Sequence, residues 1–146
     1  MNVQAILSSK GDEVATITPG ATLAEASAAL RDHGVGALVV SADGRHIEGI
    51  VSERDVVRAL AAHGGSTLGR TVSSCMSPQV VTCSRNESIE HLMGLMTDRR
   101  IRHLPVVDDA GLLGGIISIG DVVKARLGEL ERENSHLHEY IQGNVG

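Results

Sequence analysis

The chain has 146 residues, of which 42% are hydrophobic and 21% charged, and its formal net charge is −5. A chain of this size forms one ordinary domain or two small ones, which excludes a large multidomain enzyme. There is no Trp or Phe and only a single Tyr. Because binding to nucleic acid needs clustered cations and stacking aromatic rings, this composition argues against a nucleic-acid partner.

Cysteine and histidine usage gives no sign of a disulfide framework or a metal site. Cys75 and Cys83 are the only cysteines, and none of the seven histidines shows the spacing of a zinc site. Residues 1–7 lack the basic and apolar regions of a signal peptide. No apolar run approaches the roughly 18 to 20 residues of a membrane-spanning helix. We therefore expect a cytoplasmic protein with no membrane partner and no metal.

The first half of the chain alternates strand and helix patterns. In chain order we predict a strand at 14–17, a helix from Thr22, strands at 37–40 and 47–51, and a helix from Asp55. Thr22 and Glu25 have the spacing of a capping box, and apolar residues follow at helical intervals. Asp43 and Gly44 favour a tight turn between the two strands. This order predicts a β-α-β-β-α unit.

The second half repeats the first. A shift of 66 residues lays 14–59 over 80–125 without a gap. The corresponding predicted elements are a strand at 80–83, a helix from Ser88, strands at 103–107 and 112–117, and a helix from Asp121. Such self-similarity indicates one structural unit that occurs twice. We therefore predict an α/β (α+β) fold in which two β-α-β-β-α units pack by pseudo-two-fold symmetry.

The predicted boundaries follow this repeat. Residues 1–62 form the first unit and 71–127 the second, joined by a Gly- and Ser-rich linker at 63–70. The lead-in 71–77 resembles 2–8 at a shift of 69 residues. Residues 128–146 form a C-terminal helix or tail.

The C-terminal segment has the pattern of a coiled coil. Apolar residues and one Asn recur at intervals of three and four, at Leu127, Leu130, Asn134, Leu137 and Ile141. If Leu127 is an a position, Asn134 is one too, and the charges at e and g suit a parallel dimer. Because two heptads are marginal alone, a helix packed on its own chain is an equal alternative to a homodimer.

The repeated motifs resemble those of a tandem pair of CBS domains, the cystathionine-β-synthase type. The resemblance is carried by Thr16 and Thr82, by 102–107, and by Gly-Ile-x-Ser-x-x-Asp at 49–55 and 115–121. It implies a non-catalytic regulatory module with clefts between its units. By this resemblance the clefts bind an adenine nucleotide, which is AMP, ADP, ATP or NAD(H). Binding would signal energy or redox state to a target enzyme or transporter. The resemblance also adds weight to a homodimer.

The chemistry of these residues agrees with that implication. The turn from Ser52 to Asp55 stands between a strand and a helix, where backbone N–H groups and the helix dipole favour an anion. An aspartate there suits the two hydroxyls of a ribose, at roughly 1.5 to 3 kcal/mol per hydrogen bond. Aliphatic side chains would enclose the adenine. The candidate ligand-binding residues are Thr16, Ile17, Ala37, Val39, Ser52, Arg54, Asp55, Thr82, Cys83, Arg102, His103, Pro105, Ser118, Gly120 and Asp121.

Each of these features has a simpler interpretation. A Ser-x-x-Asp motif is also a capping box, and Arg102 with His103 could be a solvated pair, although the resemblance implies that they contact phosphate. The first half has Gly36 and Ala37 at those positions, so Arg54 is the candidate to supply charge there. We therefore expect two unequal clefts.

Two other functions compete with nucleotide binding. One is a structural homodimer without a ligand, acting through its C-terminal helix. The other is a small Cys/His enzyme that uses Cys75 or Cys83, although no orienting motif accompanies either cysteine. The motifs of nucleotide hydrolysis and of dinucleotide redox folds are absent.

Overall fold

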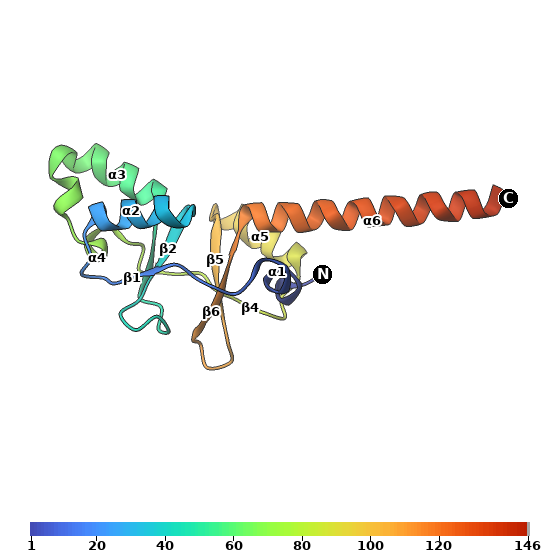
Figure 1. The fold of residues 1–146 in the computed structure, drawn as a ribbon, viewed down its shortest axis with the longest axis horizontal. Coiled ribbons are helices and arrows are strands. Elements are labelled where there is room, and N and C mark those ends of the chain that lie inside the picture. The colour runs from blue at the N-terminus through green and yellow to red at the C-terminus, as the bar shows by residue number, and fades with distance from the viewer. Residues whose placement is uncertain (146) are drawn as a thin grey trace.

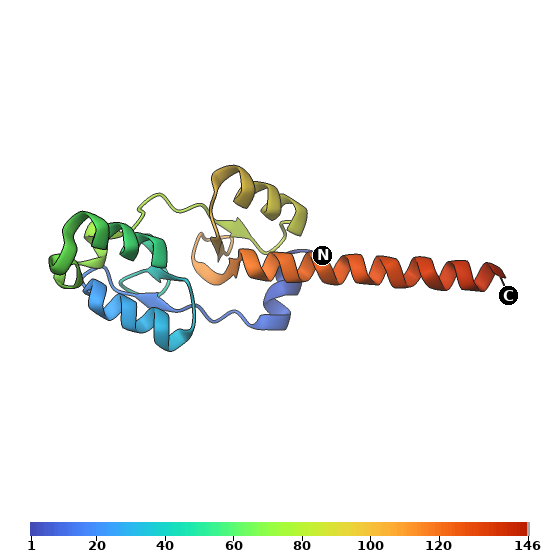
Figure 2. The same cartoon turned by 90° about the horizontal axis from the view of Figure 1, so that it is seen from above.

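The computed structural model describes the backbone of residues 1–145 and the side chains of 1–138 and 141. Two halves of the same construction lie side by side, and one helix projects from them (Figures 1 and 2). The first half contains β1 (Thr16–Ile17), α2 (Leu23–His33), β2 (Ala37–Val40), β3 (Gly49–Ser52) and α3 (Glu53–His63). The second contains β4 (Cys83–Ser84), α5 (Ile89–Arg99), β5 (His103–Val107), β6 (Leu113–Ser118) and α6 (Ile119–Val145). The lead-in and connecting elements are α1 (Val3–Lys10), the 3-10 helix η1 (Gly64–Gly69) and α4 (Val72–Cys75).

Each half has its own three-stranded sheet with the same topology. In the first sheet β1 is parallel to β2, and β2 is antiparallel to β3. The second sheet repeats this with β4, β5 and β6. The prediction of two β-α-β-β-α units is therefore confirmed. The strand ends differ by a few residues, and α3 and α6 begin two residues before Asp55 and Asp121, because Ser52 and the matching Ser118 end the preceding strands.

Side chains of the central strands β2 and β5 point alternately to the two faces of the sheet, and both faces are buried. Leu38 and Val40 of β2 belong to the core of the first half, and Leu104 and Val106 of β5 belong to the core of the second. The intervening residues point to the opposite sheet face. Val39 lies on that face and is fully buried. We infer that this face is covered by the other half.

The lead-in helices pack across the halves. Val3, Ile6 and Leu7 of α1 lie in the core of the second half. Val72 of α4 lies in the core of the first half, with Met76 packed against it. The helix that precedes one copy of the repeat therefore packs in the core of the other copy. The predicted units, 1–62 and 71–127, assign each of these helices to the copy that it precedes.

The segment predicted as a linker is folded onto the first half. Thr67 of η1 is fully buried, and its hydroxyl donates to the carbonyl oxygens of Ala59 (3.1 Å) and Gly64 (2.7 Å). Glycine and serine content suggested a free connection, but a single buried threonine anchors the segment. The connection is therefore part of the packed structure.

The last helix is continuous. The predicted extension from residue 128 is the direct continuation of α6, which runs from Ile119 to Val145 and projects beyond the rest of the chain (Figure 1). Residue 146 lies outside the described residues. Within the described part of the chain, no helix has the length and hydropathy needed to cross a membrane.

Candidate functional site

Both Ser-x-x-Asp motifs form capping boxes where a strand passes into a helix. In the first half the backbone N–H of Ser52 donates to Asp55 Oδ2 (2.8 Å), and the Asp55 N–H donates to Ser52 Oγ (3.4 Å). In the second half the corresponding distances between Ser118 and Asp121 are 2.9 and 3.1 Å. The structural interpretation of the motif is therefore correct for both copies. It leaves open a second role for the carboxylates, since these bonds use only Oδ2.

The capping boxes reduce the number of amides that are available to an anion. The N–H of Glu53 donates to the carbonyl of Gly36 (3.0 Å), and the N–H of Ile119 donates to that of Arg102 (2.8 Å). Two of the first three amides of each helix are thus satisfied by the protein. The expectation of several free N–H groups at these turns needs correction, because only the Arg54 and Gly120 amides lack such a bond among the described residues.

Asp121 forms an ion pair, and none is found for Asp55 among the described residues. Lys10 Nζ at the end of α1 lies 2.6 Å from Asp121 Oδ2 and 3.0 Å from the carbonyl oxygen of Ile116. Burial raises the pKa of the Asp121 carboxyl, but hydrogen bonds from Lys10 and Ser118 outweigh it, so the net pKa is lowered. At the shift that aligns the lead-ins, Lys10 corresponds to Gln79.

His103 connects the two halves. A Cβ placed on Gly36 would lie 3.2 Å from His103 Cε1 and 3.7 Å from Glu53 Oε1, so the ring, Gly36 and Glu53 lie close together. Burial lowers the pKa of His103, and the positive charges of Lys10 and Arg102 lower it further. The negative charges of Glu53 and Asp121 raise it, but the net pKa is below its ordinary value. His103 is therefore half-buried between the halves, whereas Arg102 is exposed. A polar cluster of Lys10, Glu53, His103 and Asp121 marks this contact.

The remaining predicted residues lie on the faces of the sheets that point away from the cores or at the surface. Ala37, Val39 and Pro105 are buried on the faces of β2 and β5 that point away from the cores. Thr16 and Thr82 are exposed. Arg54 is exposed at the start of α3, and no hydrogen bond or ion pair of its side chain is found among the described residues.

Two residues predicted to contact adenine direct their side chains toward the cores. Ile17 packs against the core of the first half, and Cys83 is 3% exposed within the core of the second. Both point inward because β1 and β4 present one face to their own core. Burial raises the pKa of Cys83 to about 12, so its thiol is not a thiolate at neutral pH. This argues against a Cys83 nucleophile.

Lys10 and Glu53 are the cluster members that sequence reasoning missed. Glu53 stands inside the Ser-x-x-Asp motif, at a position where the second half has Ile119. Lys10 belongs to the lead-in, and only its alignment with Gln79 marks it as a difference between the copies. The alignment does not predict that Lys10 contacts Asp121, because the two residues are 111 positions apart in the sequence.

Comparison with known proteins agrees with this geometry. The CBS domain family matches residues 5–62 and 72–128. The CBS domain-containing protein CBSX3, mitochondrial, of Arabidopsis thaliana is 39% identical over 126 residues, which are 84% of this chain and 61% of the relative. This chain therefore spans less than two thirds of that relative's length.

Two solved structures are informative. The crystal structure of a CBS-domain containing protein from Agrobacterium tumefaciens has a TM-score of 0.80 and 45% identity, covering 86% of this chain and 98% of that one. The CBS domain pair of protein MJ0100, solved with methylthioadenosine and S-adenosyl-L-methionine, has a TM-score of 0.74 and 25% identity, with coverage of 88% and 98%. Stand-alone CBS pairs are regulatory modules and are generally non-catalytic. With one match on each half of the repeat, this chain belongs to the CBS domain family and is a tandem CBS pair.

Proposed function

We propose that this CBS pair binds adenine nucleotides between its two units and changes the activity of a partner protein when nucleotide occupancy changes. One observation carries the proposal. Asp55 and Asp121 occupy equivalent positions at the starts of α3 and α6, each fixed by a capping box beside the surface where the halves meet. The adenosine ligands of the MJ0100 pair support the same ligand class.

The carboxylates have the hydrogen-bonding capacity that a ribose needs. All hydrogen bonds to the two side chains, among the described residues, go to Oδ2. Oδ1 of each therefore remains able to accept from a 2′- or 3′-hydroxyl. A hydrogen bond to a charged group contributes about 1.5 to 3 kcal/mol. Val39 and Pro105 supply aliphatic surface for the adenine, and the hydroxyls of Thr16 and Thr82 supply polar contacts.

The cations suggest where phosphate groups would lie. Lys10 contacts Asp121, and the charges of Lys10, Arg102 and Asp121 all act on His103, whereas Arg54 is the cation nearest in sequence to Asp55. Gly120 stands where the first half has Arg54, and a Cβ there would meet only Ser118 Oγ, at 3.6 Å. The backbone at the start of α6 is therefore open to a ligand. We propose that the two clefts differ in their affinity for phosphate.

The contact between the halves provides a route from ligand to partner. A ligand changes an equilibrium only if it binds one arrangement more tightly than another. Because His103 lies against Gly36 and Glu53 of the other half, a ligand that attracts its ring or Lys10 would alter the packing of the halves. The target is an enzyme or transporter. AMP and ATP would report energy state, and NAD(H) would report redox state.

Equilibrium titration of the full chain with AMP, ATP, NADH and S-adenosylmethionine tests this proposal. Asp121→Ala and Asp55→Ala should each weaken binding at their own cleft about tenfold or more, because one ribose contact is worth at least 1.4 kcal/mol. Asp109→Ala, in an exposed turn, is the matched control and should retain wild-type affinity. Wild-type binding that survives both aspartate substitutions would refute the assigned ribose contacts.

A structural homodimer without a ligand is the second candidate, and the exposed apolar residues of α6 favour it. Thermal unfolding with each nucleotide separates the two. A ligand at 100 times its Kd stabilises the folded state by about 2.7 kcal/mol. A melting temperature that no nucleotide changes would support the homodimer alone.

A further inference from the structure

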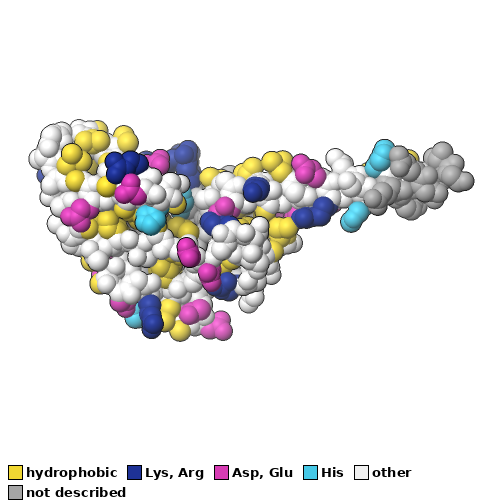
Figure 3. All heavy atoms as spheres, viewed as in Figure 1, with side chains coloured by type: hydrophobic (Ala, Val, Ile, Leu, Met, Phe, Trp, Pro, Cys, Tyr) yellow, Lys and Arg dark blue, Asp and Glu magenta, His cyan; other side chains and the backbone are white. Residues whose placement is uncertain are grey.

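One face of α6 carries an apolar strip that its own chain leaves exposed. Val123, Leu127, Leu130, Leu137 and Ile141 are 45, 55, 41, 58 and 52% exposed. Asn134 interrupts the series at the same spacing and is exposed too. Together these six residues are called the α6 seam. Figure 3 shows hydrophobic side chains at the surface above the first part of α6.

The seam is separate from the face by which α6 packs on its own chain. Val122 is fully buried, and Ala125 packs against the core of the second half. Glu129 on the same face binds Arg126 (2.8 Å) and the N-terminal amine (3.2 Å). Successive helical residues point about 100° apart, so the seam is turned by about a third of a circle from that face. From residue 130 onward every described side chain is exposed, so packing on the own chain does not account for the seam.

We propose that the α6 seam pairs with the seam of a second copy in a parallel, in-register, two-stranded coiled coil. With Leu127 at a, the a positions hold Leu127, Asn134 and Ile141, and the d positions hold Val123, Leu130 and Leu137. Apolar residues at a and d with one Asn at a are typical of dimers. Most of the stability of a helix in a protein comes from packing of its apolar face, and the second copy supplies that packing.

Asn134 determines the orientation. In a parallel, in-register pair it lies opposite the partner subunit's Asn134, and the two amides can hydrogen-bond to each other. In an antiparallel pair each a residue faces a d residue, so Asn134 would face Val, Leu or Leu and bury an unpaired amide. An unsatisfied buried polar group costs about 1 to 3 kcal/mol. The parallel arrangement is the one that avoids this cost.

The flanking charges fit the same arrangement. In a parallel coiled coil a g residue lies beside the e residue five positions later on the partner. Arg126 then lies beside the partner subunit's Glu131, and Glu133 lies beside the partner subunit's His138. By symmetry each contact occurs twice. The first contact brings opposite charges together, and the second brings a carboxylate beside an imidazole.

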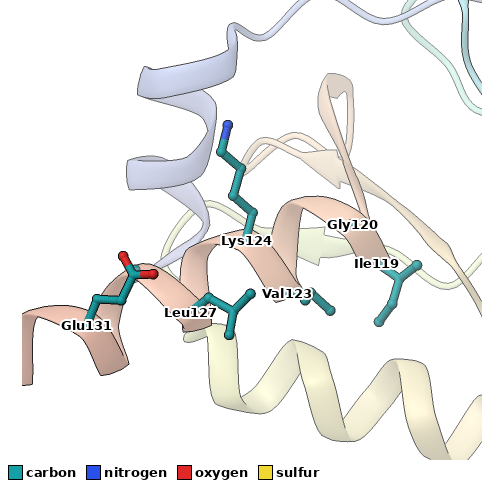
Figure 4. Close-up of a pocket in the computed structure, with 7 residues that line it drawn as sticks. Ile119, Gly120, Val123, Lys124, Leu127 and Glu131 are labelled. Carbon is teal, nitrogen blue, oxygen red and sulfur yellow. The ribbon is translucent and has the colours of Figure 1, made fainter. Parts of the chain in front are cut away.

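The surface along the first part of the seam is open to a partner helix. It runs from Ile119 to Glu131 on α6 alone, with Val123 and Leu127 among its residues (Figure 4). Gly120 and Gly128 add no side chain to it. The CBS family match ends at residue 128, so most of the seam lies beyond the shared domain. The inference does not depend on nucleotide binding.

Sedimentation of the full chain over a range of concentrations tests the pairing. The wild type should sediment at twice the 15.3 kDa chain mass, and Leu130→Glu/Leu137→Glu should sediment as a monomer. Ser135→Glu/His136→Glu adds the same charges to the same helix off the seam and should remain dimeric. Far-UV circular dichroism checks that each variant is folded. A monomeric wild type, or a dimer that survives the seam substitutions, would overturn the proposal.

Cysteine cross-linking tests the orientation, in a Cys75→Ser background. Leu127→Cys and Leu137→Cys should each form a disulfide dimer on its own under mild oxidation, because each residue faces itself in a parallel pair. An antiparallel pair places residue 127 opposite 137 or 130. Cross-linking only when the two variants are mixed would therefore contradict the parallel arrangement.

Discussion

Lys10 is the residue through which the N-terminal helix reaches the proposed ligand cleft. Its ammonium bonds to Asp121 Oδ2 and to the carbonyl of Ile116. A ribose at Asp121 would share that carboxylate with Lys10, and a phosphate would compete for the ammonium. The first half has no equivalent, because Gln79 occupies the matching position. This difference adds to those at Glu53, Arg54, Arg102 and His103, and together they make the surroundings of the two aspartates electrostatically unequal.

Lys10→Gln should destabilise the protein at neutral pH by about 1 kcal/mol, since the pair is partly solvated and one charged hydrogen bond is lost. The pKa of Asp121 is below its ordinary value of 3.8 in the folded protein. Its contribution is therefore present at neutral pH and is lost as the pH falls through the folded-state pKa. Urea unfolding at pH 7 and below pH 4 measures this.

The matched control is Lys124→Gln, which removes an exposed lysine of α6 that has no ion pair among the described residues. We expect it to change stability by less than about 0.5 kcal/mol. If Lys10→Gln were as mild as this control, or if its effect persisted at low pH, the ion pair would not be the cause.

The aspartates could be predicted from the sequence, but their surroundings could not. Ser-x-x-Asp in two copies identifies both the capping boxes and the candidate ribose contacts. The partners of Asp121 and His103 come from α1 and from the other half. Spacing within one element carries no information on such contacts. For the same reason the alternation of β1 and β4 was too short to show that Ile17 and Cys83 face their cores.

At the scale of elements, a glycine in each sheet lets a lead-in helix approach closely. A Cβ on Gly115 would lie 2.9 Å from a methyl of Leu7, next to α1. A Cβ on Gly49 would lie 2.5 Å from Met76 Sδ and 3.0 Å from the carbonyl oxygen of Ser77. The two glycines are equivalent in the repeat, as are Leu7 and Met76 in the lead-ins. The same kind of contact therefore packs each lead-in segment against a strand glycine of the other half's sheet.

Gly49→Ala should destabilise the protein by about 1 to 3 kcal/mol, the usual cost of overpacking. The backbone of Ser77 cannot easily move, because Ile50 and Ser77 exchange two hydrogen bonds of 3.1 and 2.9 Å. Gly94→Ala in α5 is the control. It meets no atom within 4 Å and should stabilise by about 0.5 to 1 kcal/mol. Thermal and denaturant unfolding measure both.

Opposite signs for the two alanines are the expected result. A neutral or stabilising Gly49→Ala would show that Met76 and Ser77 do not pack on this strand as described. The element order and strand pairing could be predicted from the repeat, because hydrophobic periodicity is local. The close approach of a lead-in segment to a strand glycine is a tertiary contact, and the local pattern does not contain it.

At the scale of the whole molecule, the two halves are bound together by exchange of their lead-in helices. The second core contains α1, and the first contains α4. The first core therefore extends beyond unit 1 to Met76, and the second core needs residues 3–7 from the start of the chain. A ligand bound between the halves would act on both of them at once, and the proposed pairing of the α6 seam would connect them to a second copy.

The content of the purified protein tests nucleotide binding most directly. The protein is denatured, the released small molecules are identified by mass spectrometry, and the emptied, refolded chain is titrated with AMP, ATP and NADH. We expect an adenine nucleotide to be released, or at least one of the three to bind with saturation. A protein that releases no adenine compound and binds none of the three would contradict the proposed function.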